Sequence, residues 1–455
     1  MKFLKTGLCR SFSFNMLKQE SIISLLPPEV AKVFIAYSGG VDSHVLLHLV
    51  CSVEPLKTKT TAVYINHGLQ QEAEQWASHC ESVSLDLGVK FQCINVNAQK
   101  VNGKSLEEIA REARYSAFKT LVDKQDVLLL AQHREDQMET VLLQLFRGAG
   151  VKGLSGMPLS AVFGAGEMLR PFLDVSKNEI ICYAEENKLQ WIEDPSNKSD
   201  EFDRNFLRNQ IIPQLKDRWP ALDKTIARSA RHCAKSESIS QELAKQLLNN
   251  IFNESDQTLD IIELLDLETD QQQLVIRQWF HAMKLRMPSE KKLEKILSEV
   301  VQSKTSANPK IQEQGRYVKR YRNKLYCLNQ ATIDQVVENK AWPNEERQID
   351  LNNGFSLTRE SSLDGIPKTL WHKSEISIKF REGSEKIKLP GRKGHHSLKN
   401  LFQEKAIPPW ERSQIPLIYL NDQLAAISDL WISADFYSVD KVECYQLNYI
   451  AGYFD

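Results

Sequence analysis

The sequence is poor in the features that mark membrane, secreted and metal-scaffold proteins. Its 455 residues include no run of about 18 or more apolar residues, so no membrane-spanning helix is predicted. The eight cysteines are far apart and form no C-x-x-C pair, which argues against a structural zinc site, an iron–sulfur cluster or a dithiol. Reduced thiols in a cytoplasmic protein explain this usage best. The first 19 residues lack the compact apolar segment of a signal peptide, so residues 1–30 are expected to be an N-terminal extension.

The net charge of −1 gives no sign of a polyanionic partner, but the charge is unevenly distributed. Residues 286–326 hold eleven Lys and Arg against four Glu, and residues 379–405 hold eight against three acidic residues. Because a ligand experiences the local field rather than the total charge, these two segments are candidates for contact with a nucleic acid.

Short apolar strands alternate with amphipathic helices in the first part of the chain. Strands are predicted at residues 33–37, 60–65, 91–96 and 127–131, and each is followed by a helical segment. This alternation predicts the α/β class, with a doubly wound parallel sheet. Ligands of such sheets bind at the carboxyl ends of the strands, so the residues that follow the strands are the first candidates for a site.

The pattern changes after Arg204, and the chain is expected to contain further domains. Residues 31–220 are expected to form the doubly wound catalytic domain, and residues 221–330 a mainly helical domain that binds the substrate. Helix is predicted throughout residues 204–305. Residues 331–374 are polar and turn-rich and are interpreted as a connector, and residues 375–455 as a small α+β C-terminal domain.

A six-residue loop directly follows the first strand and opens the first helix. Its glycines let the backbone approach a ligand closely, and the free N–H groups of the helix start favour an anion there. Two hydroxyls add donors, and the aspartate suggests a magnesium ion between its carboxylate and phosphates. A glycine turn in which Asp and Ser only cap the helix is the simpler alternative. The loop consists of Ser38, Gly39, Gly40, Val41, Asp42 and Ser43.

The loop matches neither the P-loop motif G-x-x-x-x-G-K-[ST] nor the dinucleotide-binding motif G-x-G-x-x-G. It contains no lysine that reaches toward a γ-phosphate. It resembles, position for position, the SGG-x-DS loop of the N-type ATP pyrophosphatases, also called PP-loop ATPases. Members of that group cleave ATP between the α- and β-phosphates, and their loop holds the departing pyrophosphate. The resemblance implies that ATP and magnesium are the cofactors.

A pair of carboxylates follows the strand at residues 127–131. In the expected helix, Met138 and Val141 face the core, while Asp136 and Glu139 are three residues apart and share the opposite side. Two carboxylates beside an ATP loop suit a cation, either magnesium or an amine. A solvated acidic helix face is the alternative.

The segment from Gln132 to Met157 resembles the tRNA(Ile)-lysidine synthetase family. That family has H-x-x-D-D-Q-x-E-T followed by R-G-x-G-x-x-G-L, and this chain has Gln132 to Thr140 followed by a similar glycine-rich run. Further matching segments are Asn66–Leu69, Ala110–Tyr115, Trp191–Asn197 and Arg204–Arg208. Glu135 departs from the pattern, because it stands where the family usually has an aspartate.

The resemblance implies a role for several pocket residues. Asp136 and Glu139 match the positions that hold the lysine substrate, and His133 is placed beside them. Asp42, Asp136, Glu139 and Arg111 are the expected catalytic residues, and His67 is expected to join the loop in binding the nucleotide. Arg111 shares a helix face with Arg114, where an exposed helix with Glu–Arg pairs is an equally good interpretation.

Cations elsewhere are candidates for tRNA contact. Arg204 and Arg208 lie near a helix start, where acids would be favoured, so they suggest an external anion. The segment Gly315–Tyr326 interleaves cations with tyrosines, which suits phosphates and exposed bases but also fits a basic hairpin with its tyrosines packed inward. The expected contacts are Arg114, Arg204, Arg208, Arg316, Lys319, Arg320, Arg322, Arg392, Lys393 and Lys399.

By this resemblance, the protein attaches free L-lysine to carbon 2 of the wobble cytidine in the isoleucine tRNA with a CAU anticodon. The cytidine is first adenylated, pyrophosphate leaves, and the lysine amine displaces AMP. A tRNA thiolase with the same loop and a non-catalytic tRNA-binding protein are the alternatives. The expected location is the cytoplasm without a membrane partner, and the sequence leaves open whether the protein forms a homodimer.

Overall fold

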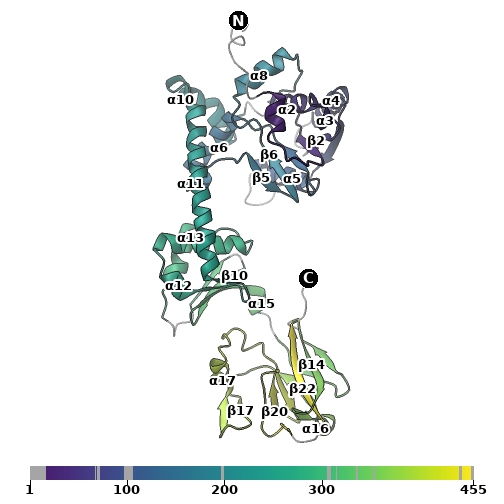
Figure 1. The fold of residues 1–455 in the computed structure, drawn as a ribbon, viewed down its shortest axis with the longest axis vertical. Helices are drawn as coiled ribbons and strands as arrows, with labels where there is room; N and C mark the ends of the chain where they lie inside the picture. Colours follow the sequence, from purple (N-terminus) through teal and green to yellow (C-terminus); the bar gives the residue numbers. More distant parts are fainter. Residues whose placement is uncertain are drawn as a thin grey trace. The chain divides into compact units, whose positions relative to one another are not determined.

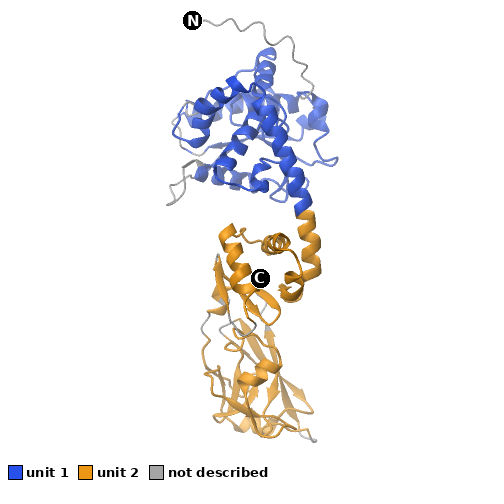
Figure 2. Ribbon diagram, turned by 90° about the vertical axis from the view of Figure 1, so that its left-hand side faces the viewer, with its two compact units in different colours: residues 1–240 blue, residues 241–455 orange. Residues whose placement is uncertain are grey.

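The computed structural model describes residues 17–66, 68, 72–96, 106–195, 199–304, 309–313, 315–334, 337–351, 354–439 and 443–451. It divides into two compact units, Met1–Ser240 and Gln241–Asp455 (Figure 2). Among the described residues, no helix is both long enough and apolar enough to cross a membrane.

The first unit is built on a six-stranded sheet in the order β3-β2-β1-β4-β6-β5 (Figure 1). All its pairs are parallel except β5 with β6. The four strands expected from the sequence are present as β1 to β4. The strands are β1 (Val33–Ala36), β2 (Thr60–Asn66), β3 (Lys90–Asn95), β4 (Val127–Leu129), β5 (Ser160–Phe163) and β6 (Gly166–Leu169).

Helices cover both faces of this sheet, as the apolar strands require. On β1, Val33 and Ile35 lie in one core cluster together with residues of the first long helix. Phe34 points to the opposite face and lies in a second cluster with Phe118. The helices are α1 (Gln19–Ile23), α2 (Val41–Cys51), α3 (Glu54–Lys57), α4 (Ala73–Asp86), α5 (Leu106–Lys119), α6 (Arg134–Phe146), α7 (Val151–Leu154) and α8 (Lys177–Glu186).

The central strands bring the two candidate segments to one edge of the sheet. β1 and β4 are hydrogen-bonded neighbours in parallel register, with Val33 opposite Val127. The phosphate loop follows β1, and the segment that opens α6 follows β4, so both lie at the carboxyl ends of adjacent strands.

A helical segment closes the first unit and packs on α6. Met138 of α6 is fully buried against Leu207 and Ile212. The helix that follows continues past residue 240 into the second unit. The elements are α9 (Asp203–Phe206), the π-helix η3 (Leu207–Ile211), α10 (Ile212–Arg218) and α11 (Leu222–Ile251).

The second unit begins with helices on a five-stranded antiparallel sheet in the order β7-β8-β11-β10-β9. The prediction of continuous helix over residues 204–305 is wrong at residues 252–260, because β7 and β8 add a short hairpin to the edge of β11. The elements are β7 (Phe252–Asn253), β8 (Thr258–Asp260), α12 (Ile261–Leu265), α13 (Thr269–Ala282), α14 (Glu290–Lys295), the π-helix η4 (Ile296–Val301), β9 (Lys310–Glu313), β10 (Arg316–Tyr321), β11 (Lys324–Asn329) and α15 (Gln330–Ile333).

The remaining strands form further antiparallel sheets. The segment interpreted as a connector contributes strands to them: β14 pairs along its whole length with β22 at the end of the chain, and β12 pairs with β16. These elements are β12 (Lys340–Ala341), β13 (Gln348–Asp350), β14 (Phe355–Ser362), β15 (Ile366–Pro367), α16 (Lys368–Lys373), β16 (Ile376–Lys379), β17 (Lys386–Lys388), β18 (His395–Ser397), α17 (Leu398–Glu404), β19 (Leu417–Leu420), β20 (Gln423–Ile427), β21 (Trp431–Ile432) and β22 (Cys444–Ala451).

Candidate functional site

The loop between β1 and α2 has the geometry of a phosphate-binding turn. Gly39 has a φ of 80°, a conformation that favours glycine, and Gly40 is the N-cap of α2. The Ser43 hydroxyl donates to the Gly40 carbonyl at 3.0 Å and accepts from the Ser38 amide at 3.2 Å. A Cβ on Gly39 would lie 2.8 Å from Ile192 Cδ1, so a larger residue does not fit there without movement of the wall.

The loop opens onto a cavity of about 750 Å³ within the first unit. Ser38, Gly40, Asp42 and Ser43 line it, and so do the expected lysine-binding residues of α6. Arg114 also lines this cavity. Arg111 lies outside the lining, with its guanidinium 5.0 Å from the centre of the Tyr115 ring. His67 lies outside the described residues.

Asp42 has a cationic partner that the sequence motifs did not indicate. Lys177, the first residue of α8, donates from its Nζ to both carboxylate oxygens of Asp42, at 2.5 and 2.7 Å. The backbone N–H of Lys177 donates to Glu135 Oε2 at 3.0 Å. The only sequence signal near it is the capping box of Ser176 and Glu179, which predicts the helix start but gives no role to the lysine between them.

His133 is buried among three carboxylates. Its Nδ1 lies 3.3 Å from Glu135 Oε2, and its Nε2 lies 3.4 Å from Asp136 Oδ2 and 3.8 Å from Asp42 Oδ1. Burial acts to lower the pKa of His133, but the carboxylates outweigh it and raise this pKa above the ordinary value. Burial also acts to raise the pKa of Glu135, but His133, the Lys177 amide and Lys216 lower it to about 2.

The two carboxylates assigned to lysine binding are paired with the two arginines assigned to tRNA. Arg204 Nε donates to Glu139 Oε2 at 2.8 Å, and Arg208 Nε donates to Glu139 Oε1 at 2.6 Å. Arg208 also donates to Asp136 Oδ1 at 3.1 Å. Glu139 is only 1% exposed, so these charge-assisted bonds replace the water contacts that its carboxylate has lost.

Four of the carboxylates that line the cavity are thus paired with lysine or arginine side chains. The carboxylates are Asp42, Glu135, Asp136 and Glu139, and the lysine and arginine partners are Lys177, Lys216, Arg204 and Arg208. Removing one member of such a pair would leave a poorly solvated charge, whereas a ligand ion of matching sign can replace it. The arrangement suits one ligand with phosphates and another with an amine.

Three family models match the chain in succession. A PP-loop domain matches residues 15–215, a TilS substrate binding domain matches residues 259–326, and a TilS substrate C-terminal domain matches residues 376–449. A tRNA(Ile)-lysidine synthase of Methylococcus capsulatus is 37% identical over 88% of this chain and 92% of its own length. Those of Coxiella burnetii and Legionella pneumophila are 38% and 36% identical, over 88% and 91% of this chain and 89% and 95% of their own lengths.

The chain belongs to the tRNA(Ile)-lysidine synthase family. This confirms the resemblance drawn from its motifs, and the family models extend it to the second unit. The alternatives with other PP-loop reactions lose their main support, because the similarity to lysidine synthases covers the chain almost from end to end.

Several cations proposed for tRNA contact have partners within the second unit. Lys319 is only 9% exposed and lies 5.2 Å from the ring centres of both Tyr317 and Trp410. Arg320 donates to the carbonyls of Val301 and Ser303 at 2.6 and 2.7 Å, which ties β10 to the end of η4.

The other predicted contacts are more accessible. Arg316 is half-buried on β10, and Arg322 is exposed while it donates to the Gln403 carbonyl at 2.5 Å. Arg392 pairs with Glu404 at 2.9 Å, and Lys393 and Lys399 are exposed.

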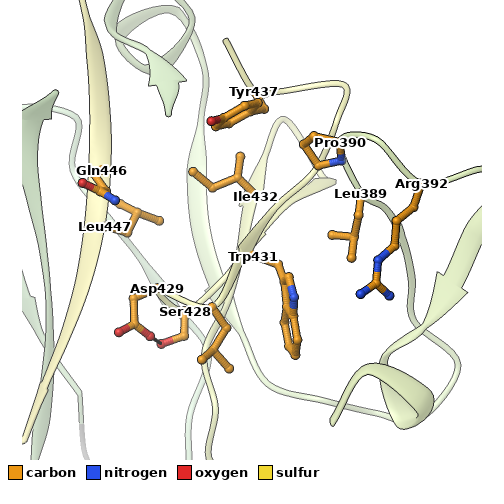
Figure 3. Close-up of a pocket in the computed structure, with 11 residues that line it drawn as sticks. Leu389, Pro390, Arg392, Ser428, Asp429, Trp431, Ile432, Tyr437, Gln446 and Leu447 are labelled. Atoms are coloured by element: carbon orange, nitrogen blue, oxygen red, sulfur yellow. Dashed lines mark hydrogen bonds between the residues drawn. The ribbon is translucent and has the colours of Figure 1, made fainter. Parts of the chain in front are cut away.

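A second cavity of about 330 Å³ lies in the C-terminal part of the second unit (Figure 3). Gln446 and Leu447 of β22 line one side, and Arg392 and Trp431 lie on the opposite side. The lining of this cavity therefore includes one of the predicted tRNA-contacting cations and an aromatic ring.

Proposed function

We propose that the protein ligates free L-lysine to carbon 2 of the wobble cytidine in the CAU-anticodon isoleucine tRNA, at the expense of ATP. The observation that carries this proposal is one cavity that holds both a phosphate loop and a paired-carboxylate site. Membership in the lysidine synthase family gives the same reaction class. A purely tRNA-binding role gives no reason for the two sites to share a cavity.

The first step is adenylation of the cytidine. Its 2-oxygen attacks the α-phosphorus of ATP, and the bond to the departing pyrophosphate breaks. The backbone N–H groups at the start of α2, together with Ser38 and Ser43, are positioned to hold the pyrophosphate. Asp42 fits a magnesium ion, because one carboxylate plus substrate phosphates is a usual ligand set for it, and the bound ion would neutralise phosphate charge.

The second step is attack by the lysine amine. Asp136 and Glu139 are proposed to hold the lysine substrate, with the ammonium group replacing part of their bonds to Arg204 and Arg208. After the ammonium group has lost a proton to solvent, the neutral amine displaces AMP from carbon 2, so a carbon–nitrogen bond forms as the carbon–oxygen bond to AMP breaks. Positioning of the two reactants in one cavity supplies much of the rate advantage.

The tRNA is proposed to be held by cations at the cavity and in the second unit. Arg114 lines the cavity, and the accessible cations of the second unit are suited to phosphates. For the second unit these are Arg316, Arg322, Arg392, Lys393 and Lys399. We place the reaction in the cytoplasm, where the tRNA substrate is found.

Mass analysis of isoleucine tRNA after incubation with ATP and labelled lysine tests the function. The expected product carries one lysine on the wobble cytidine, and pyrophosphate and AMP are released with it. Formation of ADP and orthophosphate, or pyrophosphate release that needs a sulfur donor instead of lysine, would contradict the proposal.

A further inference from the structure

Lys177 is bonded directly to the aspartate of the phosphate loop. It stands 135 positions after Asp42 in the chain, yet its Nζ contacts both oxygens of that carboxylate. The side chain lines the cavity and is 35% exposed, so a ligand in the cavity can reach it.

The loop itself supplies no cation for a triphosphate. It offers hydroxyls and backbone N–H groups, and Asp42 would repel phosphates unless its charge is neutralised. Lys177 supplies this neutralisation in the ligand-free protein. When another cation takes the Asp42 oxygens, the ammonium group loses its partner close to the place where the phosphates bind.

The backbone of Lys177 is held independently of its side chain. Its N–H donates to Glu135, and the preceding Ser176 caps α8 with Glu179. The flexible four-carbon stem can therefore change partners while the helix start stays in place. With a fixed backbone and a flexible side chain, the ammonium group of Lys177 can move from Asp42 to a bound ligand.

We propose that Lys177 is a phosphate-binding residue, which holds Asp42 in the ligand-free pocket and contacts the non-bridging oxygens of the pyrophosphate moiety when ATP is bound. The proposal rests on the proposed use of ATP. It assigns to α8 the cation that P-loop proteins carry within the loop.

Calorimetric binding of an α,β-methylene analogue of ATP, with magnesium and without tRNA, tests the proposal. Lys177→Ala should weaken analogue binding by about tenfold to a hundredfold, as expected for a lost charge-assisted bond, and should change AMP binding less than about twofold. Lys177→Arg should keep most of the affinity. Lys90→Ala, at an exposed lysine outside the cavity, serves as the matched control. Unchanged analogue binding, or equal weakening of the analogue and AMP, would overturn the proposal.

A second comparison separates phosphate contact from simple neutralisation of Asp42. Inorganic pyrophosphate without magnesium is titrated into the Asp42→Asn variant and into the double variant Asp42→Asn with Lys177→Ala. If Lys177 contacts phosphate, its removal should still weaken binding about tenfold in the Asp42→Asn background. If the two proteins bind pyrophosphate equally, Lys177 acts only through Asp42 and the proposal is wrong. Because no tRNA or lysine is present, failure of lysidine formation by the wild-type protein would be recognised separately.

Discussion

The cations around the site of the first unit and two cations of β10 in the second unit have different kinds of partners. In the first unit, Lys177, Arg204 and Arg208 are paired with carboxylates. In the second unit, Arg320 is tied to backbone carbonyls, and Lys319 is packed between aromatic rings. A carboxylate can accept a different cation when a ligand arrives, whereas a buried carbonyl that loses its donor has no replacement.

This difference separates cations that can take part in ligand exchange from those that stabilise the fold. Local sequence does not reveal it, because the partners of both groups come from segments that are not adjacent in the chain. Substitution of a carboxylate-paired residue is therefore expected to change ligand binding, and substitution of a carbonyl-bound residue is expected to change stability.

The largest effect is expected at the phosphate loop. Asp42→Ala should lower the rate of lysine-dependent pyrophosphate release by about a thousandfold or more, because the proposed magnesium ligand and the partner of Lys177 are both lost. Radiometric pyrophosphate release with isoleucine tRNA measures it, with exposed Asp86→Ala as the control. Activity within about tenfold of the wild type would remove Asp42 from the adenylation step.

A large, pH-dependent effect on stability is expected at Glu135. Its pKa is lowered to about 2 in the folded protein, so it stabilises the fold above the ordinary carboxyl pKa, and this contribution is lost as the pH falls toward 2. Glu135→Gln should therefore lower the free energy of unfolding by about 3 kcal/mol at neutral pH, and by progressively less below about pH 4.5. Urea unfolding at several pH values measures this. A loss that stays the same down to about pH 2 would show that ionisation of Glu135 is not its source.

Substitution of Asp136 should affect the binding of lysine more than the binding of the nucleotide. Asp136→Asn is expected to raise the KM for lysine by about thirtyfold or more, because one anionic partner of the amine is lost. The affinity for the ATP analogue should change less than about threefold. Equal losses of lysine and nucleotide binding would mean that the cavity lacks the proposed division into two sites.

The smallest effects on function are expected in the second unit. The triple variant Arg392→Ala, Lys393→Ala and Lys399→Ala should weaken tRNA binding by about threefold to tenfold and reduce its salt dependence, with the KM for lysine unchanged. Filter binding at several salt concentrations measures this.

Arg320→Ala is compared with the triple variant, because Arg320 is bound to backbone carbonyls. It should lower the midpoint of thermal unfolding, since the carbonyls of Val301 and Ser303 lose their donors, while tRNA affinity changes less than about twofold. If Arg320→Ala reduced tRNA binding more than the triple variant, the separation between fixed and exchangeable cations would be wrong for this unit.

The sequence was informative where the pattern is local. The four strands β1 to β4 were predicted to within two residues of their ends, because short apolar runs alternate with amphipathic helices there, but the short helix α3 was not predicted. The pairing of β14 with β22 joins Phe355 to Ala451, and no local pattern encodes a contact over such a separation. The β7–β8 hairpin was missed because its strands have only two and three residues.

At the site, too, only the residues that belong to a local motif could be predicted. The loop and the acidic pair of α6 were recognised as motifs, but Lys177 belongs to the pocket only because α8 packs beside α2. Arg204 and Arg208 were expected to face an external anion, which stays a prediction. Their observed partners are nevertheless carboxylates 65 to 72 positions earlier in the chain, which their own helix does not reveal.

The close approach of Gly39 to Ile192 and Cys80 restricts which residues can replace this glycine during evolution. Trimming the wall, for example by Ile192→Val, would relieve the steric conflict of an alanine at position 39 only in part. The backbone would still have to hold a side chain at a φ of 80°, which remains costly for residues other than glycine. The steric conflict and the positive φ are two independent constraints that keep glycine at position 39. No single substitution of a neighbouring residue removes both of them.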